Sequence, residues 1–193
     1  MELMARYPDN YFDLAIVDPP YGLGDSVVNS GGRFKKYHNN NGNWDYEIPS
    51  KDYFKELFRV SKNQIIWGGN YFPLPASKCF IIWDKLQPEG VSFAMCEYAW
   101  ASFNSVAKIF KKRTQGQEDR FHPTQKPVYL YSFLLKHFAK QGDKILDTHL
   151  GSGSIAIACH DYGFELTACE LDSEYYEKAV QRIKNHTNQQ KLF

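Results

Sequence analysis

Residues 13–21 read DLAIVDPPY, a short apolar run that ends in an acid, two prolines and an aromatic residue. Such a run predicts a buried parallel strand, and Pro19 and Pro20 end it because neither can donate a ladder hydrogen bond. Asp18 is therefore expected at the carboxyl end of a strand, where open α/β sheets bind ligands. A rigid acceptor followed by the ring of Tyr21 suits a flat, amino-bearing substrate such as a nucleobase. The alternative is a strand-ending turn with a surface aspartate and a packed tyrosine.

A second strand and turn come late in the chain. Residues 144–147 predict a strand that ends in Asp147, residues 151–154 form a Gly-Ser-Gly-Ser turn before a helix, and the next strand ends in Glu170. Glycines let a ligand approach the backbone, and an acid about 20 residues further on can accept from ribose hydroxyls. The turn lacks the third glycine of a dinucleotide site and the Lys-Ser/Thr of a phosphate loop. A nucleoside without a phosphate chain remains, and S-adenosylmethionine fits; the alternative is an ordinary βαβ crossover.

Composition bounds the rest of the interpretation. The chain has 193 residues, 43% of them hydrophobic and 16% aromatic, and a net charge of +1. This length suits one domain, and the charge provides no global electrostatic case for nucleic acid. Cys79, Cys96, Cys159 and Cys169 show no metal-binding spacing. Cys79, Cys159 and Cys169 lie in apolar strand or helix patterns, which indicates reduced core residues of a cytoplasmic protein. We expect no membrane span and no metal.

The remaining pattern predicts the other elements. Strands are expected over 64–67, 79–83, 97–103 and 106–110, the last two as an antiparallel pair. Helices are expected over 2–7, after Ser50, from Pro127 to Gly142, over 155–162, and after Asp172 or Ser173. The last helix is expected to turn a set of apolar side chains inward: Tyr176, Ala179, Val180 and Ile183.

Two basic stretches are candidate contacts for nucleic acid. Residues 22–43 are rich in glycine and asparagine, which predicts a long functional loop or a solvated linker. Lys111, Lys112 and Arg113 form a charge run that is typical either of a solvated face or of phosphate contacts.

Three motifs in their order along the chain carry a resemblance. Asp18–Tyr21 comes first, the segment HPTQKP at 122–127 second, and DTHLGSGS at 147–154 third. This arrangement resembles the amino-methyltransferases that modify exocyclic nitrogens of DNA bases, in the permuted beta class with the catalytic motif first. Residues 67–71 and 82–85 also look like strand-end segments of that family. The resemblance covers nearly the whole chain.

The resemblance implies a Rossmann-like, mostly parallel sheet with helices on both faces and an antiparallel hairpin at one edge. It implies a single domain, with a catalytic half over 1–113 and a cofactor-binding half over 122–193. S-adenosylmethionine is the implied cofactor, and DNA with a flipped-out adenine is the implied partner. The implied catalytic residues are Asp18, Pro19, Pro20 and Tyr21. The implied cofactor-binding residues are Asp18, Lys126, Asp147, His149, Gly151, Ser152, Gly153, Ser154, Glu170 and Leu171. The candidate DNA contacts are Arg33, Lys35, Lys36, Lys111, Lys112 and Arg113.

Lys126 is also a candidate phosphate contact or a solvated lysine, and His122 is expected at the helix entry or the cofactor pocket. The chain departs from the family's pattern in two places. No separate target-recognition segment is evident, so sequence choice would rest on the 22–43 loop, a second subunit such as a homodimer partner, or a short site. No strand ending in Gly-Asp precedes residue 12, so we expect the strand at 165–170 to form a sheet edge. Cytosine N4, an amine in RNA or a small molecule, and a catalytically impaired binding remnant stay open as alternatives, as does the biological role.

Overall fold

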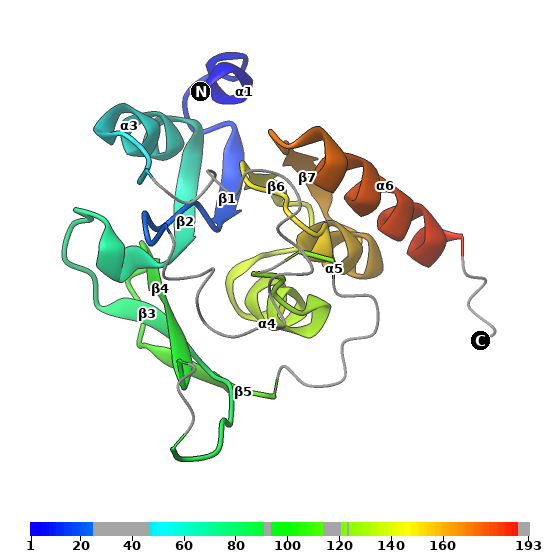
Figure 1. Ribbon diagram of the computed structural model, residues 1–193. Coiled ribbons are helices and arrows are strands. Elements are labelled where there is room, and N and C mark those ends of the chain that lie inside the picture. The colour runs from blue at the N-terminus through cyan, green and yellow to red at the C-terminus, as the bar shows by residue number, and fades with distance from the viewer. Residues whose placement is uncertain (25–46, 91–93, 114–120, 123, 189–193) are drawn as a thin grey trace.

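The computed structural model describes residues 1–24, 47–90, 94–113, 121–122 and 124–188. Its strands are β1 (Phe12–Val17), β2 (Ser61–Trp67), β3 (Cys79–Asp84), β4 (Cys96–Ala101), β5 (Lys108–Lys111), β6 (Lys144–Asp147) and β7 (Glu165–Ala168). They form one seven-stranded sheet in the order β5-β3-β4-β2-β1-β6-β7. Neighbouring strands are parallel except where β4 pairs with β2 and β3. All strands other than β4 therefore end at the same edge of the sheet (Figure 1).

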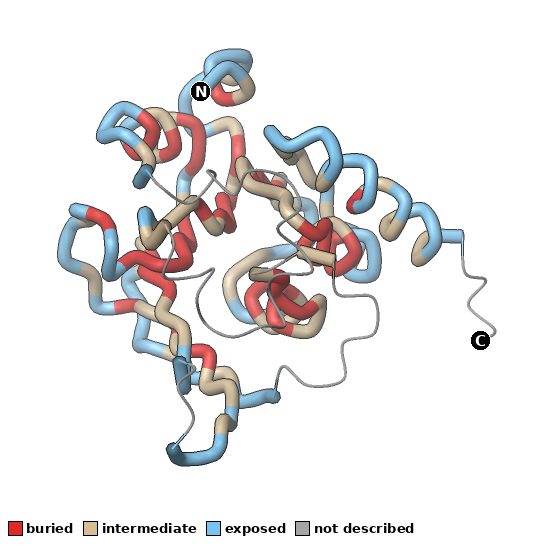
Figure 2. The backbone as a smooth tube through the Cα atoms, viewed as in Figure 1, coloured by how far each residue is buried: buried red, intermediate tan, exposed pale blue. Residues whose placement is uncertain are grey.

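Helices cover both faces of this sheet. The helical elements are α1 (Glu2–Ala5), α3 (Lys51–Val60), the 3₁₀ turn η3 (Gly69–Tyr71), α4 (Val128–Phe138), α5 (Ser154–Tyr162) and α6 (Ser173–Thr187). Strand β1 alternates between the faces: Leu14 and Ile16 pack with α4 and α5, whereas Ala15 and Val17 pack with α1 and α3. The buried residues accordingly follow the sheet and the helices that meet it (Figure 2).

The helix ends largely follow the local signals. The side chain of Ser50 accepts a hydrogen bond from the amide of Tyr53, and the side chain of Asp172 accepts one from Tyr175, so both predicted caps are confirmed. Gly163 ends α5 with a φ of +72°, a conformation that glycine adopts without steric cost. The predicted inner face of α6 is partly wrong. Tyr176 is 50% exposed and Ala179 is buried.

The predicted antiparallel pair of 97–103 with 106–110 is also wrong. Strand β4 pairs with β3 on one side and β2 on the other, so both of its edges are occupied. Strand β5 instead adds in parallel to the free edge of β3, and the antiparallel strand lies inside the sheet. At the opposite end, β7 forms the expected edge of the described sheet.

Part of the predicted organisation falls outside the described residues. Nearly all of the 22–43 loop, including Arg33, Lys35 and Lys36, lies outside the described ranges. Across the ranges that the structure does describe, every helix is too short or too polar to cross a membrane.

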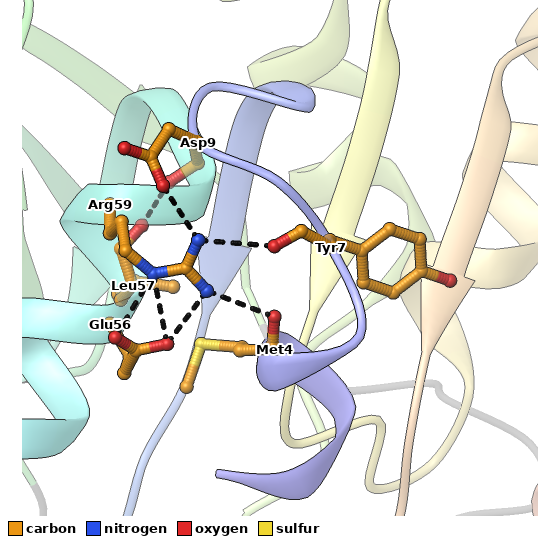
Figure 3. A network of polar contacts seen from close by, with 7 residues as sticks. Met4, Tyr7, Asp9, Glu56, Leu57 and Arg59 are labelled. Carbon is orange, nitrogen blue, oxygen red and sulfur yellow. Dashed lines mark hydrogen bonds and ion pairs between the residues drawn. The ribbon is translucent and has the colours of Figure 1, made fainter.

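Arg59 joins α1 to the end of α3 (Figure 3). Its guanidinium donates to the backbone oxygens of Met4 and Tyr7 and to the carboxylates of Asp9 and Glu56. Met4 lies in the four-residue helix α1, and Tyr7 lies just after its end. The Met4 oxygen already accepts from the amide of Tyr7 at 3.1 Å, so Arg59 adds a second hydrogen bond there and ties the turn after α1 to α3.

We expect Arg59→Met to loosen the first ten residues without unfolding the sheet. Methionine keeps much of the apolar stem but removes the guanidinium donors that contact Met4, Tyr7 and Asp9. Hydrogen–deuterium exchange should accelerate at the amides of residues 5–7 and 10, while the amides of β1 and β2 stay protected. Lys62→Gln, which removes an exposed ion pair with Asp13, is the matched control and should leave the exchange of α1 unchanged. Unchanged exchange in Arg59→Met would contradict the assigned contact.

Candidate functional site

The two principal motifs meet at the edge where the parallel strands end. Strand β1 pairs directly with β6, with Leu14 opposite Ile145 and Ala15 opposite Leu146. Asp18, which follows β1, and Asp147, which ends β6, are consequently neighbours at this edge. Glu170 lies just beyond the end of β7, the next strand along. Segments that are far apart in the chain thus bring three acids to the same edge of the sheet.

The carboxylate of Asp18 is held through both of its oxygens. The hydroxyl of Tyr21 donates to Oδ1 at 2.5 Å, and the ammonium of Lys126 contacts Oδ2 at 2.5 Å. The side chain of Asp18 keeps 16% of its surface exposed, whereas that of Lys126 keeps 3%. Each carboxylate oxygen has a second lone pair, so Asp18 can accept further hydrogen bonds from a ligand.

Lys126 lies in the interior, so both of its interpretations as a solvated lysine and as a phosphate contact are wrong. Its ammonium also pairs with Oε2 of Glu97 at 3.1 Å, and the other oxygen of Glu97 pairs with Lys85 at 2.6 Å. Burial opposes the charge of Lys126, but Asp18 and Glu97 outweigh it and raise its pKa. Burial likewise opposes ionisation of Glu97, yet Lys126 and Lys85 hold its pKa at about 2. Residues 82–85 resemble a strand-end segment of the family, but no local pattern predicted that Lys85 would pair with Glu97 or Glu97 with Lys126.

The ring of Tyr21 is packed against other residues. Gly68, with a φ of +67°, leaves room for it, because an added Cβ there would lie 2.2 Å from Cε1 of Tyr21. Tyr71 stacks on the ring at a centroid distance of 5.0 Å and an interplanar angle of 16°. Tyr71 is 43% exposed, so it supplies the accessible aromatic surface at this point.

Asp147 is buried beside a short chain of polar groups. One oxygen accepts from the amide of His149 at 2.9 Å. Thr148 hydrogen bonds to the hydroxyl of Tyr53 at 2.7 Å and to the ring of His149 at 3.0 Å. Burial raises the pKa of Asp147 to about 8 and lowers that of His149 to about 4. At neutral pH the imidazole of His149 is therefore neutral and the carboxyl group of Asp147 is largely protonated. A cation placed beside Asp147 would favour its ionisation.

Glu170 is oriented by the backbone. Its Oε2 accepts from the amide of Gly151 at 2.7 Å, and its Oε1 accepts from Leu171 and Asp172 at 2.9 and 3.0 Å. A lone pair on Oε2 remains for a ligand hydroxyl. Leu171 is fully exposed beside it, which is unusual for a large apolar side chain and provides a surface for a flat ring.

The serines of the turn have their side chains directed into the protein. Ser152 and Ser154 hydrogen bond to each other at 3.1 Å. Arg182 of α6 donates to the backbone oxygen of Ser152 and to the hydroxyl of Ser154. Gly153 has a φ of +74°, and an added Cβ would lie 3.0 Å from Ile183. These side chains and Gly153 join the turn to α6, so any ligand contact from them comes through the backbone.

His122 and the basic run lie where contacts with a ligand or a nucleic acid are feasible. The ring of His122 packs on Tyr175 at 4.4 Å and sits 3.7 Å from the position that a Cβ of Gly151 would occupy. Lys111 ends β5, Lys112 and Arg113 follow it, and all three are exposed at the same sheet edge as Asp18. The ammonium of Lys112 lies 3.9 Å from the ring centroid of Tyr129.

Comparisons with known proteins agree with this arrangement. Residues 64–181 match the N6/N4 methyltransferase family model, which is described as DNA methylase. The type II methyltransferase M2.DpnII of Streptococcus pneumoniae is 36% identical over 242 aligned positions, covering 97% of this chain and 88% of that protein. M2.LlaDCHI of Lactococcus lactis subsp. cremoris is 32% identical, with 94% and 86% covered. The 242 positions exceed this chain's length, so M2.DpnII carries residues without a counterpart here.

Solved structures show the same fold. The complex of M1.HpyAVI with S-adenosylmethionine superposes with a TM-score of 0.60 at 18% identity, covering 93% of this chain and 92% of that one. The cytosine-N4-specific PvuII DNA methyltransferase also gives 0.60, at 13% identity, with 97% and 88% covered. The protein therefore has the α/β fold of these methyltransferases, and by its sequence it belongs to the N6/N4 family of DNA methylases.

Proposed function

We propose that this protein transfers a methyl group from S-adenosylmethionine to the N6 amino group of adenine in DNA. The observation that carries the proposal is the placement of Asp18. Its carboxylate is held at the carboxyl end of β1 by Tyr21 and Lys126, on the strand next to Asp147. The choice of adenine rests on Asp18 as the first residue of the DPPY motif, because the resembled adenine enzymes mostly have aspartate there.

The groups beyond β6 and β7 suit S-adenosylmethionine, which supplies a methyl group on a cationic sulfonium centre. Asp147 is a buried carboxyl group that a cation would ionise. Glu170 is oriented to accept from a ribose hydroxyl, and the exposed Leu171 offers a surface for the adenine ring. The backbone at Gly151 leaves room for a ligand, since the nearest described atoms to an added Cβ would be those of the His122 ring, at 3.7–3.9 Å.

The residues after β1 would activate the amine of the target base. Its lone pair is delocalised into the ring, so it is a poor nucleophile. Asp18 would accept one amino hydrogen and the carbonyl of Pro19 the other, which favours a pyramidal nitrogen with an available lone pair. Alignment of the two reactants can supply part of the roughly 7–11 kcal/mol available from positioning. Acceptors already in place for the positive charge on nitrogen add an electrostatic contribution.

The DNA would approach the carboxyl edge with the target base out of the helix, at a cost of a few kcal/mol. Tyr71 and the ring beneath it, Tyr21, provide an aromatic surface for that base. Lys111, Lys112 and Arg113 lie at the same edge and would contact phosphates. Arg33, Lys35 and Lys36 stay candidate DNA contacts.

Methyl transfer from tritiated S-adenosylmethionine to DNA, RNA and free nucleosides tests this proposal directly. We expect incorporation into DNA alone. Expression in a methylation-deficient host, followed by long-read sequencing, should then place N6-methyladenine at a recurring short sequence. N4-methylcytosine would overturn the choice of base, incorporation only into RNA or nucleosides would overturn DNA as substrate, and bound cofactor without transfer would indicate a binding remnant.

Asp147 makes a further prediction about pH. Its pKa of about 8 in the free protein means that a cationic ligand binding beside it releases a proton at neutral pH. Affinity for S-adenosylmethionine should therefore rise with pH between about 6 and 8, by at most tenfold per unit, and Asp147→Asn should lose this dependence. Calorimetry in buffers of different ionisation enthalpy measures the released proton. Equal pH slopes in the two proteins would rule out Asp147 as the titrating group.

A further inference from the structure

Asp18 belongs to a continuous series of four charged side chains whose charges alternate in sign. Asp18 pairs with Lys126, Lys126 also pairs with Glu97, and Glu97 pairs with Lys85. They come from four separate places: the turn after β1, the segment before α4, strand β4, and the residue after β3. Lys126 and Asp18 are 108 residues apart in the chain. Burying an ammonium this deeply is costly unless it is well compensated, and one carboxylate would suffice for neutrality.

The second carboxylate has a chemical use if the proposed function holds. Methyl transfer to a neutral amine leaves the nitrogen as a cation with one proton too many. That proton must leave for the secondary amine product to form, and Asp18 is the group that accepts a hydrogen bond from this amine. When the N–H bond breaks, its electron pair stays on nitrogen and the proton forms an O–H bond on Asp18, whose charge disappears. Lys126 would then be a buried cation without a counter-ion, were it not for Glu97.

We infer that Lys126 and Glu97 are positioning residues for Asp18 as the acceptor of the product's proton. Lys126 orients the carboxylate of Asp18, and Glu97 balances the charge of Lys126 while Asp18 carries that proton. Lys85 in turn keeps Glu97 ionised from the outer side. This inference rests on the proposed function for its chemical meaning, but the electrostatic coupling that it requires exists in the free protein.

The coupling predicts opposite effects from its two partners. Removing Lys126 takes away the cation at Oδ2, so Asp18 should take up a proton more readily than in the wild type. Removing the charge of Glu97 leaves Lys126 entirely to Asp18, so Asp18 should take up a proton less readily. Removing Lys85 weakens the support of Glu97 and should have a smaller effect in the same direction as removing Lys126. Other groups that face Asp18 are held constant in all three variants: Tyr21, Tyr53 of α3, Tyr131 of α4 and Asp147 of β6.

The test is a carbon-13 carboxyl titration of Asp18 by NMR in the free protein, for wild type, Lys126→Met, Glu97→Gln and Lys85→Gln. Relative to wild type, we expect the midpoint pH of this titration to be higher in Lys126→Met, lower in Glu97→Gln and slightly higher in Lys85→Gln. Lys126→Arg should lie close to wild type because it retains the charge. Glu174→Gln, which removes an exposed ion pair with Lys178 on α6, is the control and should leave Asp18 unchanged. Should Lys126→Met fail to fold, the opposite signs of Glu97→Gln and Lys85→Gln still decide the matter.

Activity supplies the second readout. The acidic limb of the kcat profile against pH should move in the same direction as each NMR pKa. At its plateau Glu97→Gln should lose at least about tenfold in kcat, with an unchanged dissociation constant for S-adenosylmethionine. Shifts of one sign in all variants, or none, would overturn the inference even if the wild type methylates DNA. Absence of methyl transfer by the wild type would instead overturn the proposed function and leave the titration as an independent result.

Discussion

Asp18→Ala is expected to lower methyl transfer by at least about 10³-fold while S-adenosylmethionine still binds. The substitution removes the acceptor that holds the target amine, and it leaves Asp147 at the end of β6 and Glu170 just beyond β7. Single-turnover transfer to DNA measures the loss, and calorimetry should show that the cofactor still binds to the variant.

Two further variants make this result interpretable. Asp18→Ala leaves Lys126 paired with Glu97 alone, which is destabilising, so Asp18→Asn serves as the variant of nearly equal shape. Asp13→Ala is the control, because Asp13 lies on the same strand and holds Lys62 and the amide of Lys144 on its amino-terminal side. It should retain the wild-type rate. Near-normal turnover in Asp18→Asn and Asp18→Ala would show that this carboxylate is not the acceptor.

Glu170→Ala is expected to weaken binding of S-adenosylmethionine by about 10- to 100-fold, in line with the loss of one or two charge-assisted hydrogen bonds. Two causes act together. The ligand hydroxyl loses its acceptor, and the amides of Gly151, Leu171 and Asp172 lose the carboxylate that holds the turn in place. Calorimetry of the free protein with the cofactor gives the dissociation constant.

Glu170→Gln separates the two causes. The amide keeps an oxygen for part of the backbone contacts but lacks the charge, so its affinity should fall between those of wild type and Glu170→Ala. Glu165→Ala changes an exposed glutamate at the other end of β7 and should bind as wild type does. An unchanged dissociation constant in Glu170→Ala would exclude the ribose role.

Much of the site's outline could be predicted because it depends on neighbours in the chain. An apolar run stopped by two prolines places Asp18 at a strand end whatever the rest of the fold does. The same holds for Asp147 before its glycine turn and for the cap at Ser50, whose hydroxyl accepts from an amide three residues away.

Strand pairing was predicted less well, since it depends on which edges remain free. Residues 97–101 and 108–110 are close in sequence and alternate well, yet β3 lies between their strands. Strand β4 already has partners on both sides, and hydrogen bonding in a sheet allows two neighbours at most. The wrong prediction for Tyr176 has a similar origin. Helix α6 packs on α5 along a stripe around Ala179, and this stripe is narrower than the set of apolar residues that the sequence shows on the helix.

Local sequence thus sufficed for the ends of strands and the turns that carry acids, because these reflect steric and hydrogen-bonding preferences over a few residues. The order of three motifs along the chain sufficed for the family resemblance. Assembly of the sheet alone decided the partners of those acids. Lys126 pairs with Asp18 and Glu97, and Arg182 secures the serines of the turn, through contacts that span much of the chain. Burial is the physical reason. A charge removed from water must find its counter-ion wherever the packed fold brings one within reach, and no pattern of nearby residues records where that is.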